Sequence, residues 1–193
     1  MALRKLENRA VEFRRALSMK MENGILVADG AMGTRLLSNG VRPGRCLDEL
    51  NLSLPALVRD VHQEYLRAGA EIVSANTFGA NRKRLKSFGF EDRVEAINRA
   101  GVRIAREAAR DQAFVAGIVG PTGERMEPWG NLSEAEAREV FRQQVEALTG
   151  AGVDLLVFET FQDLAELRAA VVAARQLVGD ALVLAGQVTV SAT

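Results

Sequence analysis

The sequence predicts an α/β fold in which parallel β-strands alternate with α-helices. Short apolar runs recur along the 193 residues, and each is followed by a segment whose apolar residues are spaced as on a helix. Two helix-to-strand junctions, at residues 68–73 and 151–156, repeat one order of residues: Ala-Gly, a small apolar residue, an acid and then the strand. This alternation implies right-handed crossovers, in either a closed barrel or an open doubly wound sheet.

Two observations favour the barrel. Small or polar residues follow every predicted strand, as in a (β/α)8 TIM barrel, whereas an open sheet concentrates such residues at one switch point. No Gly-x-Gly-x-x-Gly fingerprint follows the first strand. A complete barrel takes about 250 residues, and about five βα units can be counted here. We therefore expect an amino-terminal part of a barrel, poorly stable alone because of its open edge.

The first strand is predicted at residues 25–28, where four apolar residues indicate a strand covered on both faces. It ends at Asp29, and the turn Asp29-Gly-Ala-Met-Gly-Thr34 follows. Gly30 and Gly33 allow a sharp turn and leave backbone N–H groups accessible to a ligand. Binding or catalysis is therefore expected at this carboxyl end.

The other elements are predicted from apolar spacing and from breaker residues. Helices are expected at 34–38, 55–69, 80–90, from 94 to about 108, from 133 to about 148 and at 164–178, and strands at 72–75, 114–119, 153–158 and 182–190. Ser133-x-x-Glu136 is a capping box at the start of one of these helices.

Composition narrows the possible partners. Lysine plus arginine equals aspartate plus glutamate at 25 each, so neither nucleic acid nor an anionic membrane is expected as a partner. No run approaches the roughly 18 apolar residues that a membrane span requires. Cys46 is the only cysteine, which excludes an internal disulfide framework, and the cytoplasm is the expected compartment.

Residues 1–24 are predicted to form a helix that packs on the barrel, which residues 25–193 form. The apolar residues of this helix recur at spacings of three and four: Leu3, Leu6, Ala10, Phe13 and Leu17. A transit peptide is the alternative interpretation, and Glu7 and Glu12 count against it.

Four side chains at the predicted strand ends have two interpretations each. Asp29 can cap the helix after it or bind a ligand, and its position leaves both open. Glu159 follows an apolar strand, which favours a ligand role over a salt bridge inside the barrel. Asn76 and Thr77 can form a turn or contact a ligand.

Two other features are interpreted as structural. His62 is the only histidine, and it lies in the middle of a helix expected to pack outside the barrel. The basic run at residues 82–86 is interpreted as a solvated helix face, because the net charge is zero and no aromatic ladder accompanies it.

Five motifs then allow a comparison with known families. They are Asp29-Gly-Ala-Met-Gly-Thr34, Cys46-Leu-Asp-Glu-Leu-Asn51, Ala68-Gly-Ala, Asn76-Thr-Phe-Gly-Ala-Asn81 and Leu156-Val-Phe-Glu-Thr160. Together, and in this order, they resemble the homocysteine S-methyltransferase family over residues 25 to about 190. The family includes the homocysteine-binding domain of cobalamin-dependent methionine synthase, and bifunctional proteins that fuse such a domain to methylenetetrahydrofolate reductase.

The resemblance implies a (β/α)8 methyltransferase that transfers a methyl group to the zinc-bound thiolate of homocysteine, giving methionine. In the family three cysteines on later strands hold the zinc, and we expect them beyond Thr193. This chain is therefore expected to lack metal ligands and catalytic residues and to be inactive alone. Cys46 matches a different family cysteine and is not expected to be a ligand. The methyl donor stays open, with methylcobalamin and methyltetrahydrofolate as candidates, supplied by a donor domain or as a small molecule.

The resemblance also implies how the amino-acid end of homocysteine is bound. Asp29 and Glu159 match carboxylates that accept hydrogen bonds from the ammonium group. The remaining matches are Gly30, Ala31 and Met32, whose N–H groups bind the substrate carboxylate, and Asn76 and Thr77, which line the same rim.

Two other functions remain open. One is a different (β/α)8 enzyme that uses Asp29 and Glu159 as an acid/base pair on a carbonyl or glycoside substrate. The other is a truncated, non-catalytic barrel that only binds a partner or an amino acid.

Overall fold

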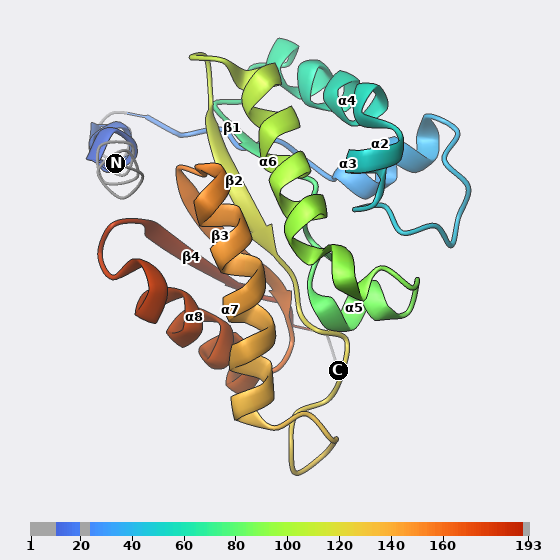
Figure 1. Ribbon diagram of the computed structural model, residues 1–193. Coiled ribbons are helices and arrows are strands. Elements are labelled where there is room, and N and C mark those ends of the chain that lie inside the picture. The colour runs from blue at the N-terminus through green and yellow to red at the C-terminus, as the bar shows by residue number, and fades with distance from the viewer. Residues whose placement is uncertain (1–10, 20–23, 191–193) are drawn as a thin grey trace.

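The computed structural model describes residues 11–19 and 24–190. Its sheet has four strands in sequential order: β1 (Ile72–Ser74), β2 (Phe114–Val119), β3 (Leu155–Phe161) and β4 (Val183–Val188). All three neighbouring pairs are parallel. Parallel strands in sequential order, each joined to the next through helices, confirm the predicted α/β fold class (Figure 1).

The helices between the strands are amphipathic, and α6, α7 and α8 lie side by side over one face of the sheet (Figure 1). The described helices are α2 (Met32–Ser38), α3 (Leu50–Ser53), α4 (Pro55–Arg67), α5 (Arg82–Lys86), the 3-10 helix η1 (Glu91–Arg93), α6 (Val94–Ala109), α7 (Glu134–Ala151) and α8 (Leu164–Val178). No helix among the described residues has both the length and the apolar character needed to cross a bilayer.

The first predicted strand is shorter and more exposed than expected. Residues 25–28 contribute one parallel bridge, between Ala28 and Ile72, on the side of β1 opposite β2. The expectation of cover on both faces is wrong, because Ile25 is 79% exposed and Val27 is 47% exposed. The segment lies at an edge of the described sheet, and its apolar composition alone could not distinguish an edge from a centre.

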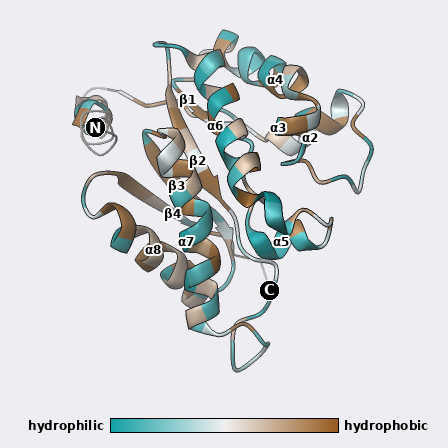
Figure 2. Ribbon diagram, viewed as in Figure 1, coloured by the Kyte–Doolittle hydropathy of each residue, from teal (hydrophilic) through white to brown (hydrophobic). Residues whose placement is uncertain are grey.

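The sheet has two apolar faces. On one face, Val115 and Val119 of β2 pack with Phe141 of α7 in the main core. On the other face, Ala116 and Ile118 pack with Phe13. The strands are mainly hydrophobic, whereas α6 and α7 carry hydrophilic outer faces (Figure 2). Because β2 is buried on both faces, its continuous apolar run predicted its bounds correctly.

Residues 11–19 are helical, and Phe13 packs edge-to-face on Phe114 with the ring centroids 4.9 Å apart. This contact places the segment against the sheet face that α6–α8 do not cover. Leu3, Leu6 and Ala10 of the predicted helix lie outside the described residues. The division of the chain at residue 24 stays a prediction.

The repeated junctions have a structural explanation. The acid of each junction accepts a hydrogen bond from a backbone N–H of the neighbouring strand segment: Val27 to Glu71 at 3.2 Å, and Val115 to Asp154 at 2.7 Å. Gly69 and Gly152 precede these acids with φ values of +99° and +89°, where glycine is strongly favoured. The repeat therefore ends a helix and fastens the next strand to its neighbour.

Candidate functional site

A pocket of about 830 Å³ lies at the carboxyl end of the strands. Every residue predicted to bind substrate lines this pocket: Asp29, Gly30, Ala31, Met32, Asn76, Thr77 and Glu159. They come from the turn after residue 28, from the residues that follow β1 and from β3. Parallel strands thus bring residues from distant parts of the sequence to one edge of the sheet.

Asp29 is fixed by the strand beside it. Its two carboxylate oxygens accept hydrogen bonds from the Ser74 N–H at 2.8 Å and the Ser74 hydroxyl at 2.7 Å. The alternative role as a helix cap is wrong, because Ala31 is the N-cap residue of α2 and no side chain caps that helix. Burial raises the pKa of Asp29, and the hydrogen bonds from Ser74 partly oppose the rise.

Glu159 is less constrained. It lies near the end of β3, half-buried, and within the described part of the chain its carboxylate forms no hydrogen bond or ion pair. The described residues therefore offer Glu159 no partner for the salt bridge that was its alternative role. Burial raises the pKa of Glu159, and the nearby charge of Asp29 raises it further. A half-buried carboxylate without a protein partner, near enough to a second carboxylate to feel its charge, forms a site where a cation can bind between the two.

The turn at residues 30–32 is supported by Tyr65 of α4. The Tyr65 hydroxyl donates to the Ala31 carbonyl at 3.2 Å. A β-carbon at Gly30 would lie only 3.0 Å from that hydroxyl oxygen, so a side chain there would crowd the ring. Contact with Tyr65 therefore explains the glycine that the sequence places directly after Asp29.

Asn76 and Thr77 have their hydrogen bonds within the protein. The Asn76 side-chain amide donates to the Leu47 backbone carbonyl at 2.8 Å and to the side-chain oxygen Oδ1 of Asn51 at 3.0 Å. The Thr77 hydroxyl donates to the Ile118 carbonyl at 2.8 Å. These bonds fasten the loop before α3 and strand β2 to the end of β1, and a substrate contact by either residue stays a prediction.

Three pocket residues were missed in the sequence. Ser74 was detectable as a hydroxyl in an otherwise apolar strand, but its partner Asp29 was not. Asp48 lies in a motif used for the resemblance; it accepts the Gly79 N–H at 2.9 Å, and burial raises its pKa to about 6. Arg84 lies over the ring of Phe78 at 5.8 Å and lines the pocket.

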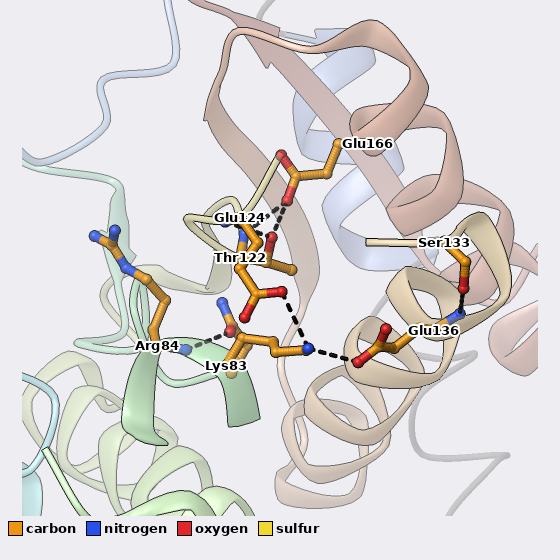
Figure 3. A network of polar contacts seen from close by, with 8 residues as sticks. Lys83, Arg84, Thr122, Glu124, Ser133, Glu136 and Glu166 are labelled. Atoms are coloured by element: carbon orange, nitrogen blue, oxygen red, sulfur yellow. Dashed lines mark hydrogen bonds and ion pairs between the residues drawn. The ribbon is translucent and has the colours of Figure 1, made fainter. Parts of the chain in front are cut away.

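The solvated-face interpretation of residues 82–86 holds for Arg82, Arg84 and Lys86, which are exposed, and is wrong for Lys83. Lys83 forms ion pairs with Glu124 at 3.1 Å and Glu136 at 2.5 Å, which join α5 to the loop after β2 and to α7 (Figure 3). Only half of the predicted capping box forms: the Ser133 hydroxyl accepts the Glu136 N–H at 3.2 Å, while the Glu136 carboxylate binds Lys83 instead. The positions of the Lys83 and Glu136 side chains thus depend on ion pairs between separate elements, which the spacing of residues along one helix does not predict.

A second buried contact fixes the same loop. Glu166 at the start of α8 accepts the Thr122 N–H at 2.7 Å and the Thr122 hydroxyl at 2.6 Å (Figure 3). Both residues are buried, and burial raises the pKa of Glu166. The loop that follows β2 is therefore held from two sides, by Lys83 of α5 and by Glu166 of α8.

The residues described do not fit a metal ion. Among 11–19 and 24–190, no group of three or more His, Cys, Asp or Glu side chains could hold one. Cys46 is 6% exposed, and burial raises the pKa of its thiol, which opposes a thiolate ligand. His62 is buried in α4 away from the pocket, and burial lowers its pKa to about 4. The described residues therefore supply no set of metal ligands, and none of their roles at this pocket depends on zinc.

Comparisons with known proteins agree with the resemblance. The chain is 31% identical over 164 residues to the methionine synthase of Mycobacterium tuberculosis and 30% identical to that of Mycobacterium leprae. It covers 14% of the length of each of these relatives.

Solved structures match more of their length. The metallated form of the homocysteine methyltransferase MmuM from Escherichia coli matches with a TM-score of 0.72 at 28% identity, over 83% of this chain and 62% of that one. Its apo form matches with a TM-score of 0.66 at 27% identity, over 86% of this chain and 60% of that one. These relatives are (β/α)8 barrels, so the predicted barrel class is confirmed, with this chain corresponding to part of a barrel.

A family model described as homocysteine S-methyltransferase matches residues 26–193, which is most of the sequence. The chain belongs to the homocysteine S-methyltransferase family.

Proposed function

We propose that this chain binds homocysteine and takes part in transferring a methyl group to its sulfur, giving methionine. The observation that carries the proposal is the pair of carboxylates, Asp29 and Glu159, which line one pocket, where the charge of Asp29 raises the pKa of Glu159. The proposed reaction is inferred from family membership. The proposed binding of the charged end of an amino acid is inferred from the residues of the pocket.

In this proposal the homocysteine ammonium lies between Asp29 and Glu159. Ser74 orients Asp29, so one acceptor is in place before the ligand arrives. The substrate carboxylate binds the backbone N–H groups of residues 30–32, which the Tyr65 contact holds in position. With its amino-acid end bound in this way, the substrate extends its thiol away from these residues.

The transfer forms a sulfur–methyl bond, breaks the bond from the methyl group to its donor, and releases the thiol proton. The described residues do not hold zinc; a zinc ion bound by other residues of the domain would supply the positive charge that keeps the sulfur a thiolate. The donor is proposed to be methylcobalamin or methyltetrahydrofolate, and the setting to be cytoplasmic. We retain the division into a helical segment before residue 25 and a barrel part after it; the family match begins at residue 26.

The proposal is tested by titrating the chain with reduced L-homocysteine in a calorimeter. Asp29→Asn and Glu159→Gln should each weaken binding by about tenfold to a hundredfold, because each removes a charge-assisted hydrogen bond. Glu107→Gln, on the exposed face of α6, is the matched control and should bind like the wild type. Wild-type affinity in both pocket variants would rule out the proposed site.

A further inference from the structure

Strand β3 contains an irregularity at the pocket. Phe158 pairs with Gly186 of β4, and Phe161 pairs with Val188, so three steps along β3 match two steps along β4. One extra residue is therefore accommodated between Phe158 and Phe161, which defines a β-bulge. Glu159 and Thr160 are the residues inside it.

The bulge changes which face each side chain occupies. Leu156 and Phe158 pack into the core beneath the helices, so in a regular strand Thr160 would be the next residue on that face. Instead, Phe161 occupies it, fully buried, with its ring centroid 5.9 Å from that of Phe141. Glu159 and Thr160 both line the pocket. The bulge thus adds Thr160 to a pocket that would otherwise receive Glu159 alone.

Thr160 adopts an unfavourable backbone conformation at this position. Its φ is +65°, a region that β-branched residues rarely occupy. Arg110, at the exposed end of α6, is the other non-glycine residue with positive φ among the described residues. Such conformations persist where the surrounding structure requires them, and often at functional sites.

The Thr160 side chain is available to a ligand. It is exposed to the pocket, and its hydroxyl forms no hydrogen bond within the described residues. The neighbouring Glu159 carboxylate also forms none. Two adjacent acceptors without protein partners among the described residues therefore line the same pocket as Asp29, which Ser74 already binds.

We propose that Thr160 is a further substrate-binding residue, whose hydroxyl is brought into the pocket by the bulge and accepts a hydrogen bond from the substrate ammonium beside Glu159. The identity of that substrate as homocysteine rests on the proposed function. The hydroxyl and Glu159 together would satisfy two of the three ammonium hydrogens, and Asp29 the third.

Side-chain substitutions at residue 160 separate the hydroxyl from the backbone conformation. Thr160→Val keeps the branched shape and the same φ requirement but removes the hydroxyl, so L-homocysteine should bind about tenfold more weakly with little change in melting temperature. Thr160→Ser keeps the hydroxyl and should restore binding. Thr160→Gly should bind as weakly as Thr160→Val, yet melt at a higher temperature, because glycine adopts positive φ without strain.

Arg110→Gly is the matched control, since it relieves positive φ at a site outside the pocket. It should raise the melting temperature and leave homocysteine affinity unchanged. The proposal is overturned if the wild type binds homocysteine, Glu159→Gln weakens binding, and Thr160→Val binds like the wild type. If the wild type and Glu159→Gln both fail to bind, the proposed function itself is wrong.

Discussion

Asp29 and Glu159 line the same pocket, but the protein holds them in different ways. Asp29 follows an edge segment and is bound through both oxygens by Ser74. Glu159 lies in a bulge of β3 and has no hydrogen bond within the described residues. Burial raises the pKa of both, and only at Asp29 do hydrogen bonds oppose the rise. The comparison indicates that the Asp29 carboxylate has a structural role, through its hydrogen bonds to β1, whereas the Glu159 carboxylate keeps its hydrogen-bonding capacity for a ligand.

Asp48 is an intermediate case, with one hydrogen bond from the Gly79 N–H. Burial raises its pKa from 3.8 to about 6. Because the folded-state pKa lies above the unfolded value, the stabilisation is fully present below the unfolded pKa and is lost as the pH rises through the folded pKa. Across this window the free energy of unfolding should fall by about 2–3 kcal/mol.

Urea denaturation between these two pKa values measures the effect, and Asp48→Asn should flatten the pH dependence relative to the wild type. Asp29 and Glu159 contribute to the same slope in both proteins, so the difference isolates Asp48. Equal slopes in wild type and variant would show that Asp48 does not titrate as described.

Neutralising the two compared carboxylates should affect stability differently. Asp29→Asn should lower the free energy of unfolding by about 1–2 kcal/mol, because an amide has one acceptor oxygen where the carboxylate has two, so one hydrogen bond from Ser74 is lost. Glu159→Gln should leave it unchanged or raise it slightly, because no partner is lost and the repulsion from Asp29 is removed. Denaturant unfolding of the two variants at neutral pH tests this contrast. Equal losses would mean that Glu159 has a partner equivalent to Ser74.

Removing the Ser74 hydroxyl should leave the Asp29 carboxylate with fewer hydrogen bonds, which brings it closer to the state of Glu159. Ser74→Ala should cost about 1 kcal/mol, since the backbone N–H still binds the carboxylate. The pKa of Asp29 should rise further, because a hydrogen bond that lowers it has been removed. Carboxyl NMR titration gives this pKa directly. Ser38→Ala, whose hydroxyl binds the Thr34 carbonyl on the surface, is the control and should not move it.

Much of the fold could be predicted because the strands and helices have strong local patterns. The apolar run at 114–119 predicted the observed bounds of β2. A strand that is buried on both faces is apolar throughout, so its sequence shows no alternation of apolar and polar residues. The same reasoning failed at 25–28, where the segment lies at an edge. β3 was predicted to end at residue 158, but the bulge carries it on to Phe161.

The pocket residues could be identified from motifs, but their contacts could not. Ser74 holds Asp29 only because residue 28 bridges to Ile72, a pairing between distant parts of the chain. Thr160 carries no local signal, because its backbone conformation opposes its own preference. Both depend on tertiary structure, which overrides local propensity at such sites.

The central claim is that Asp29 and Glu159 bind the ammonium group of the substrate. The most direct test replaces the substrate by 4-mercaptobutanoate, which is homocysteine without its amino group, and measures binding to the chain by calorimetry. L-Homocysteine should bind at least about a hundredfold more tightly than this analogue, and Glu159→Gln should reduce the difference. Equal affinity of the wild type for the two compounds would contradict the claim.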